Sequence, residues 1–115
     1  MNRRQFLIGS PLALSACTAR EVWAPDTLVS QYIYREEGPK YLTLYTMKNV
    51  GSDNGAHSAL LINASQRVIF DPAGSWEQEQ MPERNDVLFG VSPRLESYYV
   101  SFHARVTYYV IGQRI

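Results

Sequence analysis

The stretch His57-Ser58-Ala59-Leu60-Leu61-Ile62-Asn63, followed after Ala64-Ser65-Gln66 by Arg67-Val68-Ile69-Phe70, decides the fold. Both runs are rich in apolar and β-branched residues, which is typical of β-strands. The polar connection between them is short enough for a tight antiparallel turn. The sequence therefore predicts a hairpin in which residues 57–63 form one strand and residues 67–70 form the next.

Strand character extends in both directions from this hairpin. Residues 28–34 and 41–48 are rich in Val, Ile, Tyr or Thr and end in turn residues. Residues 98–110 alternate apolar and polar side chains, which is typical of a strand covered on one face. Helix is expected only as a single turn over residues 93–96. The expected fold class is mainly β, with α+β as the alternative, in a small, mostly antiparallel sheet of about five to six strands with little helix.

The N-terminal residues indicate an export signal. Arg3 and Arg4 precede an apolar run over residues 6–16, which has the length of a secretory signal and is too short to span a bilayer. Arg3-Arg4-Gln5-Phe6-Leu7 also resembles the twin-arginine export pattern, with general secretory export as the alternative. Both routes predict that the domain lies outside the cytoplasm.

A lipid-attachment motif ends this signal. Leu14-Ser15-Ala16-Cys17 resembles the bacterial lipobox, and the resemblance implies that Cys17 receives diacylglycerol and becomes the new N-terminus. Two or more acyl chains anchor a protein stably, whereas one alone binds only marginally. The expected location is the bacterial cell envelope, lipid-anchored through Cys17 and facing the periplasm. Because Thr18 and not Asp follows the cysteine, the outer membrane is favoured over the inner one in a Gram-negative cell.

This interpretation divides the chain into a signal peptide at residues 1–16, a lipidated N-terminus and tether at 17–27, and a β-rich domain at 28–115. The chain balances 11 basic against 11 acidic side chains, and loss of the signal would leave a net charge of about −2. No basic patch indicates a nucleic-acid partner. Cys17 is the only cysteine, so its lipidation would leave no thiol nucleophile and no disulfide in the domain.

Two histidines are the main candidates for chemistry, since the chain lacks the common phosphate-binding, zinc-binding and serine-hydrolase motifs. His57 opens an apolar strand on the side shared by Ala59 and Leu61, so its ring is expected at the edge of the core. His103 falls on the polar side of the strand predicted over residues 98–110, where a solvated histidine is expected. No carboxylate has ligand spacing to either histidine, so the sequence predicts no metal site and no cofactor.

At His57 the chain resembles a known family. Gly55-Ala56-His57-Ser58-Ala59-Leu60-Leu61-Ile62, followed by Arg67-Val68-Ile69-Phe70-Asp71-Pro72-Ala73-Gly74-Ser75, is similar to the first half of circularly permuted papain-like domains. These include cell-wall peptidases and acyltransferases related to lecithin:retinol acyltransferase. The resemblance implies that His57 is a general base and that a nucleophilic cysteine follows at a helix N-terminus. No cysteine follows Cys17, so either the chain stops before a half that carries it, or the domain is a noncatalytic relative.

Binding is the other class of function. Eight tyrosines and two tryptophans could form an aromatic surface for cell-wall glycan or an envelope protein. Asp71, Ser75 and Trp76 are candidate binding residues, because the hairpin would bring them to the same end of the sheet as His57. The leading interpretation is a lipid-anchored envelope protein with a noncatalytic binding domain. The alternative is the N-terminal part of a papain-like hydrolase or acyltransferase with His57 as its base, which a polar pocket around His57 would favour.

Overall fold

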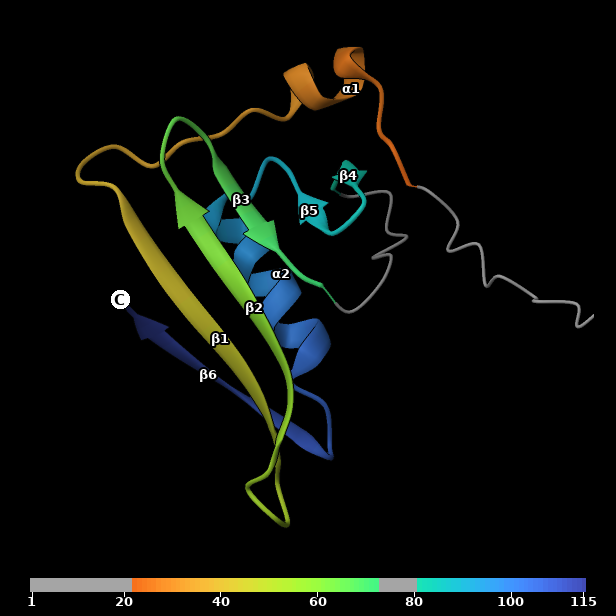
Figure 1. The fold of residues 1–115 in the computed structure, drawn as a ribbon, viewed down its shortest axis with the longest axis vertical. Coiled ribbons are helices and arrows are strands. Elements are labelled where there is room, and N and C mark those ends of the chain that lie inside the picture. Colours follow the sequence, from red (N-terminus) through yellow and green to blue (C-terminus); the bar gives the residue numbers. More distant parts are fainter. Residues whose placement is uncertain (1–21, 73–80) are drawn as a thin grey trace, which may run out of the picture.

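The computed structural model describes residues 22–72 and 81–115. Its centre is a six-stranded antiparallel sheet in the order β4-β5-β3-β2-β1-β6, with the helix α2 across one face (Figure 1). The expected fold class, a small and mostly antiparallel β-sheet, is confirmed. The candidate residues Arg3, Arg4, Cys17, Ser75 and Trp76 lie outside the described residues.

The predicted hairpin forms the middle of the sheet. β2 (Gly55–Asn63) pairs antiparallel with β3 (Arg67–Phe70), and β1 (Tyr41–Asn49) pairs antiparallel with the other edge of β2. A β-bulge interrupts the register between Met47 and Lys48. The strands predicted over residues 41–48, 57–63 and 67–70 are confirmed to within two residues at each end.

The core lies between the sheet and α2 (Pro93–His103). Side chains alternate along a strand, so every second residue of β1, β2 and β3 points to this side. Tyr99 of α2 is fully buried against them. The buried apolar cluster consists of Tyr45, Met47, Ala59, Leu61, Ile69, Met81, Leu88, Val91 and Tyr99. Packing of this kind, more than intrinsic helix propensity, stabilises a short helix such as α2.

The strand predicted over residues 98–110 is wrong. Its first part belongs to α2, and its last part begins β6 (Tyr108–Arg114), which pairs antiparallel with β1. Val100 and Phe102, expected on the covered face of a strand, pack against the core from the helix. Val106 lies in the connection between α2 and β6 and is 97% exposed.

Local signals explain where α2 begins. The Ser92 side chain caps the helix by accepting a hydrogen bond from the backbone amide of Leu95, and Pro93 occupies the first turn, where its missing N–H has no cost. Leu95, Tyr99 and Phe102 recur at helical spacing and contact the core. The single turn expected over residues 93–96 is thus the start of a longer helix.

The strand predicted over residues 28–34 is also wrong, because α1 (Asp26–Gln31) is helical. Asp26 lies in its first turn, where negative charge is favoured, and pairs with Arg84. Val29 is the one buried residue of α1, so the apolar residues that suggested a strand lie mostly at the surface. No helix in the described parts of the chain is long and apolar enough to span a membrane.

A small hairpin extends the sheet beyond β3. β4 (Glu83–Arg84) and β5 (Val87–Leu88) pair antiparallel, and β5 also pairs with β3. Asn85 in their turn has a φ of 50°, a left-handed conformation that Asn tolerates better than most residues. The sequence predicted no strand here, since two-residue strands are too short to show a period.

A buried ionic network joins β3 to α2. The Arg67 side chain is 4% exposed and donates to the Val91 carbonyl oxygen (2.8 Å) and to Oε2 of Glu96 (2.5 Å). It also donates to the Tyr41 hydroxyl (3.1 Å), while Tyr45 donates to the other carboxylate oxygen of Glu96. Burial by itself lowers the pKa of Arg67, but the bonds to Glu96 and Tyr41 outweigh it and hold the pKa above its ordinary value. The guanidinium is therefore charged and fully compensated inside the fold.

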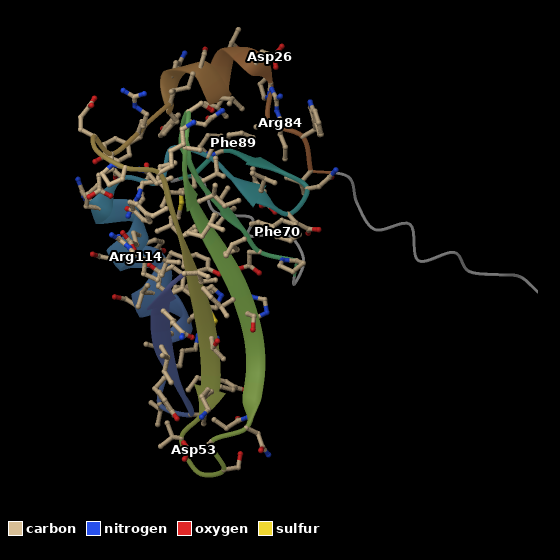
Figure 2. All side chains as sticks on the ribbon, turned by 60° about the vertical axis from the view of Figure 1, so that its left-hand side comes forward. Asp26, Asp53, Phe70, Arg84, Phe89 and Arg114 are labelled. Carbon is tan, nitrogen blue, oxygen red and sulfur yellow. The ribbon has the colours of Figure 1, made fainter. Side chains whose placement is uncertain are left out.

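The opposite face of the sheet is also apolar. Leu44 pairs with Leu60 and Leu60 with Phe70, so these three side chains form a row across β1, β2 and β3. Phe70 is 41% exposed and lies on the far side of the sheet from α2 (Figure 2). Apolar residues on both faces explain why β2 shows a continuous apolar run and not a strict alternation.

Gly90 should be intolerant of any side chain. Its φ is +69°, and a Cβ there would lie 2.2 Å from the Tyr32 carbonyl oxygen. Gly90→Ala is expected to lower the free energy of unfolding by at least about 2 kcal/mol, because the left-handed backbone alone costs about 1–2 kcal/mol and the backbone contact adds to it. Urea denaturation followed by circular dichroism measures the change.

Gly51→Ala is the matched control for Gly90→Ala. Gly51 has no heavy atom within 4 Å of an added Cβ. Its substitution is expected to change stability by less than about 1 kcal/mol. Equal stability of the two variants would contradict the close packing of Gly90 against Tyr32.

Candidate functional site

Strand register brings Asp71 next to His57. Leu60 pairs with Phe70, so the next residue, Asp71, lies opposite Ala59. Side chains alternate along a strand, and those of Asp71 and His57 both point toward α2. Oδ1 of Asp71 lies 2.6 Å from Nε2 of His57. The structure thus brings together two of the residues that the sequence singled out, at the end of the sheet where the hairpin was expected to place them.

His103 joins this pair from the last turn of α2. Its Nε2 lies 3.8 Å from Oδ2 of Asp71, and its ring stacks on that of His57 with the centroids 5.7 Å apart. The predicted place of His103 on the polar side of a strand is wrong, because the helix turns its ring toward the sheet. No carboxylate has ligand spacing to either histidine along the sequence, yet the fold places Asp71 beside both.

Tyr99 positions the Asp71 carboxylate. Its hydroxyl donates a hydrogen bond of 2.5 Å to Oδ2. Burial, together with this bond, raises the pKa of Tyr99 well above its ordinary value, so the phenol remains a proton donor. Tyr99 was not predicted as a site residue. Its spacing of one helical turn before His103 is the signal that would have found it, had the segment been recognised as helix.

The backbone of α2 sets the tautomer of His103. Nδ1 lies 2.9 Å from the carbonyl oxygen of Tyr99, and a carbonyl only accepts, so Nδ1 carries a proton. Burial lowers the pKa of His103, against the opposing effects of this bond and of Asp71. In neutral His103 the lone pair is therefore on Nε2, the nitrogen nearest Asp71.

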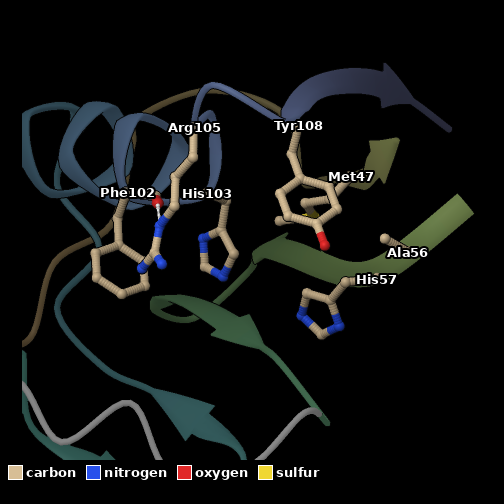
Figure 3. A pocket seen from close by; sticks show the side chains of 7 residues that line it. All are labelled: Met47, Ala56, His57, Phe102, His103, Arg105 and Tyr108. Atoms are coloured by element: carbon tan, nitrogen blue, oxygen red, sulfur yellow. Dashed lines mark hydrogen bonds between the residues drawn. The ribbon is translucent and has the colours of Figure 1, made fainter. Parts of the chain in front are cut away.

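The cluster borders an open pocket of about 290 Å³. Figure 3 shows His57 on β2 and His103 at the end of α2, with Tyr108 and Met47 on one side and Phe102 and Arg105 on the other. The side chains of His57 and His103 are 20% and 17% exposed, so a small molecule can reach both rings. The lining residues are Met47, Ala56, His57, Phe102, His103, Arg105 and Tyr108.

The two ring nitrogens of His57 have different surroundings. Nε2 is buried and, within the described residues, makes no hydrogen bond in spite of its 2.6 Å contact with Asp71. The carboxylate oxygen therefore lies away from the direction of an Nε2–H bond and acts on the ring through its charge. Nδ1, the other ring nitrogen, is not among the buried atoms without a hydrogen bond in the described part of the chain.

No protein-family model, curated protein or solved structure matches this chain. The resemblance to papain-like domains therefore stays a prediction.

Proposed function

We propose that the His57–Asp71 pair is a general-base site for acyl chemistry, in a protein anchored to the cell envelope through lipidated Cys17. The observation that carries the proposal is the contact of a carboxylate with the buried nitrogen of a histidine that lines an open pocket. Imidazole becomes a cation when it accepts a proton, and a carboxylate 2.6 Å away stabilises that cation. Tyr99 keeps the carboxylate in position.

The proposed step is proton transfer to Nδ1 of His57. A nucleophile in the pocket gives up its proton to this nitrogen and attacks an ester, thioester or amide carbonyl, and the proton then passes to the leaving group. The papain-like resemblance implies a cysteine thiol as the nucleophile, but no cysteine occurs in residues 18–115. The proton donor is therefore a hydroxyl, a water molecule or a thiol from outside these residues.

Noncatalytic binding is the second candidate, and a separate groove favours it. Tyr32 and Tyr98 are 38% and 40% exposed and, with Arg94, line a groove of about 670 Å³. Aromatic rings beside a guanidinium suit a glycan or peptide segment of the cell wall. Neither His57 nor Asp71 lines this groove, so substitutions at His57 separate the two functions.

Substitution of His57 tests the proposed general base. His57→Asn is expected to lower the turnover of acyl substrates by about 10²- to 10⁴-fold, because the nucleophile loses its proton acceptor. The assay uses membrane-extracted protein expressed from its native locus, in the presence of EDTA, with fluorogenic ester, thioester and peptide substrates. Ser58→Ala is the control, because Ser58 points to the opposite face of the sheet from His57.

The outcomes separate the candidate functions. Turnover that falls in His57→Asn but persists in Ser58→Ala supports the general base. Full activity of His57→Asn would exclude it, and absence of turnover by the unmodified protein would favour the binding groove. The intact mass of the same preparation shows whether chain beyond residues 17–115 accompanies the site and supplies a thiol.

A further inference from the structure

We propose that Nε2 of His57, Nε2 of His103 and the Asp71 carboxylate bind a divalent transition-metal ion of the zinc class. One ligand atom from each residue lies within 4.8 Å of the other two. Two imidazole nitrogens and one carboxylate oxygen form a ligand set that Zn²⁺, Co²⁺ and related ions accept. His57 comes from β2, Asp71 directly follows β3 and His103 ends α2, so only the folded protein assembles the site.

The Asp71 carboxylate lies close to both histidine side chains. Each oxygen of Asp71 lies beside a different histidine, with Oδ1 2.6 Å from His57 Nε2 and Oδ2 3.8 Å from His103 Nε2. Ligand atoms on a tetrahedral zinc lie about 3.3 Å apart when each bond is about 2.0–2.1 Å, a value between these two distances. Rotation of the side chains would be needed to place one Asp71 oxygen and both Nε2 atoms at this spacing.

A bound cation would also satisfy the buried Nε2 of His57. This nitrogen makes no hydrogen bond within the described residues, because Asp71 lies off its N–H direction. A buried polar atom without a partner is unfavourable. An ion between Nε2 and Oδ1 would accept the nitrogen lone pair and bind the carboxylate at the same time.

Outer hydrogen bonds already orient two of the three ligands. The carbonyl oxygen of Tyr99 accepts from Nδ1 of His103 (2.9 Å), so the lone pair of the neutral ring is on Nε2, the ligand atom. The hydroxyl of Tyr99 donates to Oδ2 of Asp71 (2.5 Å). Metal-binding histidines and carboxylates are commonly held by bonds of this kind. One residue thus supports two ligands.

Arg105, a basic residue that lines the pocket, does not occupy the proposed metal site. Arg105 donates to the Phe102 carbonyl oxygen (3.0 Å) and stacks on the Phe102 ring with its guanidinium carbon 4.5 Å from the centroid. Figure 3 shows this side chain folded against Phe102, away from His57. Three protein ligands leave an open coordination position for water on the pocket side.

Metal binding would regulate the proposed base, and this consequence rests on the proposed function. A metal on Nε2 of neutral His57 requires that the ring proton be on Nδ1. Nδ1 then donates a hydrogen bond and cannot accept a proton from a nucleophile. Metal and proton acceptance are therefore mutually exclusive at His57.

Titration with Co²⁺ and Zn²⁺ alone tests the site without any substrate. The full-length protein is freed of metal with EDTA, and binding is followed by the visible absorption of Co²⁺ and by calorimetry with Zn²⁺. We expect one ion per chain and tetrahedral or five-coordinate Co²⁺ absorption, which Zn²⁺ displaces. His103→Gln is expected to weaken binding more than about 10-fold, and Tyr99→Phe, which keeps all three ligands, about 10-fold or more through loss of the bond to Asp71.

Asp53→Asn is the control, because Asp53 lies at the far tip of the β1–β2 loop (Figure 2) and should leave metal affinity unchanged. Circular dichroism verifies that each variant is folded, and His57→Gln provides a second ligand variant if His103→Gln unfolds. No saturable binding of either ion, or equal affinity in the ligand variants, overturns the proposal. Because acyl turnover is measured in EDTA, failure of the metal site is distinguishable from failure of the general base.

Discussion

Arg67→Ala is expected to lower the free energy of unfolding by about 3–5 kcal/mol, the cost of breaking a buried ion pair by removing one partner. The substitution leaves Glu96 beside the core without its cation and removes the bond to the Val91 carbonyl oxygen. Both contacts join β3 to the region of α2, so the helix that carries Tyr99 and His103 loses one of its polar attachments to the sheet. Guanidinium chloride denaturation followed by circular dichroism measures the effect.

Two further variants sharpen this test. Arg94→Ala is the control, because Arg94 is exposed on the same helix and its loss should change stability by no more than about 0.5 kcal/mol. Arg67→Met combined with Glu96→Gln removes both charges and should recover part of the loss, since no unpaired charge remains. A decrease below about 1 kcal/mol for Arg67→Ala would show that Arg67 is solvated and the network loose.

Cys17→Ser is expected to abolish incorporation of labelled fatty acid. Serine cannot form the thioether that the lipobox resemblance implies, and without acyl chains the membrane binding of the domain is lost. The protein should then appear in the soluble fraction or accumulate as the unprocessed precursor. Metabolic labelling with an alkyne fatty acid, combined with membrane fractionation, measures both effects.

Thr18→Ser is the matched control for Cys17→Ser. It changes the adjacent residue but keeps the cysteine and the preceding Leu14-Ser15-Ala16, so labelling should persist. Unchanged labelling and fractionation of Cys17→Ser would rule out Cys17 as the site of lipid attachment.

The sheet could be predicted from sequence where apolar runs are separated by clear turns. The strands β1, β2 and β3 and the β2–β3 hairpin follow from local composition, because each strand is bounded by polar turn residues. The short hairpin of β4 and β5 has no such signal, since Glu83–Arg84 and Val87–Leu88 are two residues each. It is held by pairing with β3, which no local pattern reports.

The helix α2 was not predicted because its apolar residues fit both the two-residue period of a strand and the 3.6-residue period of a helix. Tyr98, Val100, Phe102 and Ala104 alternate as in a strand, yet Leu95, Tyr99 and Phe102 also share one helix face. β-Branched and aromatic residues favour the strand interpretation locally. Burial of the Tyr99 side chain against the sheet decides in favour of the helix. This contact depends on residues that are far away in the sequence.

Only part of the candidate site could be predicted from the sequence. His57 and Asp71 could be singled out from sequence because they flank the predicted hairpin, at the start of one strand and the end of the next. His103 and Tyr99 could not, because their positions depend on α2 being a helix. The error in secondary structure therefore became an error about the place of His103. The prediction of no metal site used spacing along the chain, which does not report that Asp71 lies beside both histidines.

The sequence by itself determined the central hairpin, the mainly β class and the position of His57 at the edge of the core. These features depend on neighbours along the chain, and alternation and turn chemistry report such neighbours directly. Only the tertiary structure decided that α2 is a helix and that His103 and Asp71 meet at His57. That choice came from long-range packing, because burying Tyr99 and satisfying Arg67 in the core requires the helix to lie across the sheet.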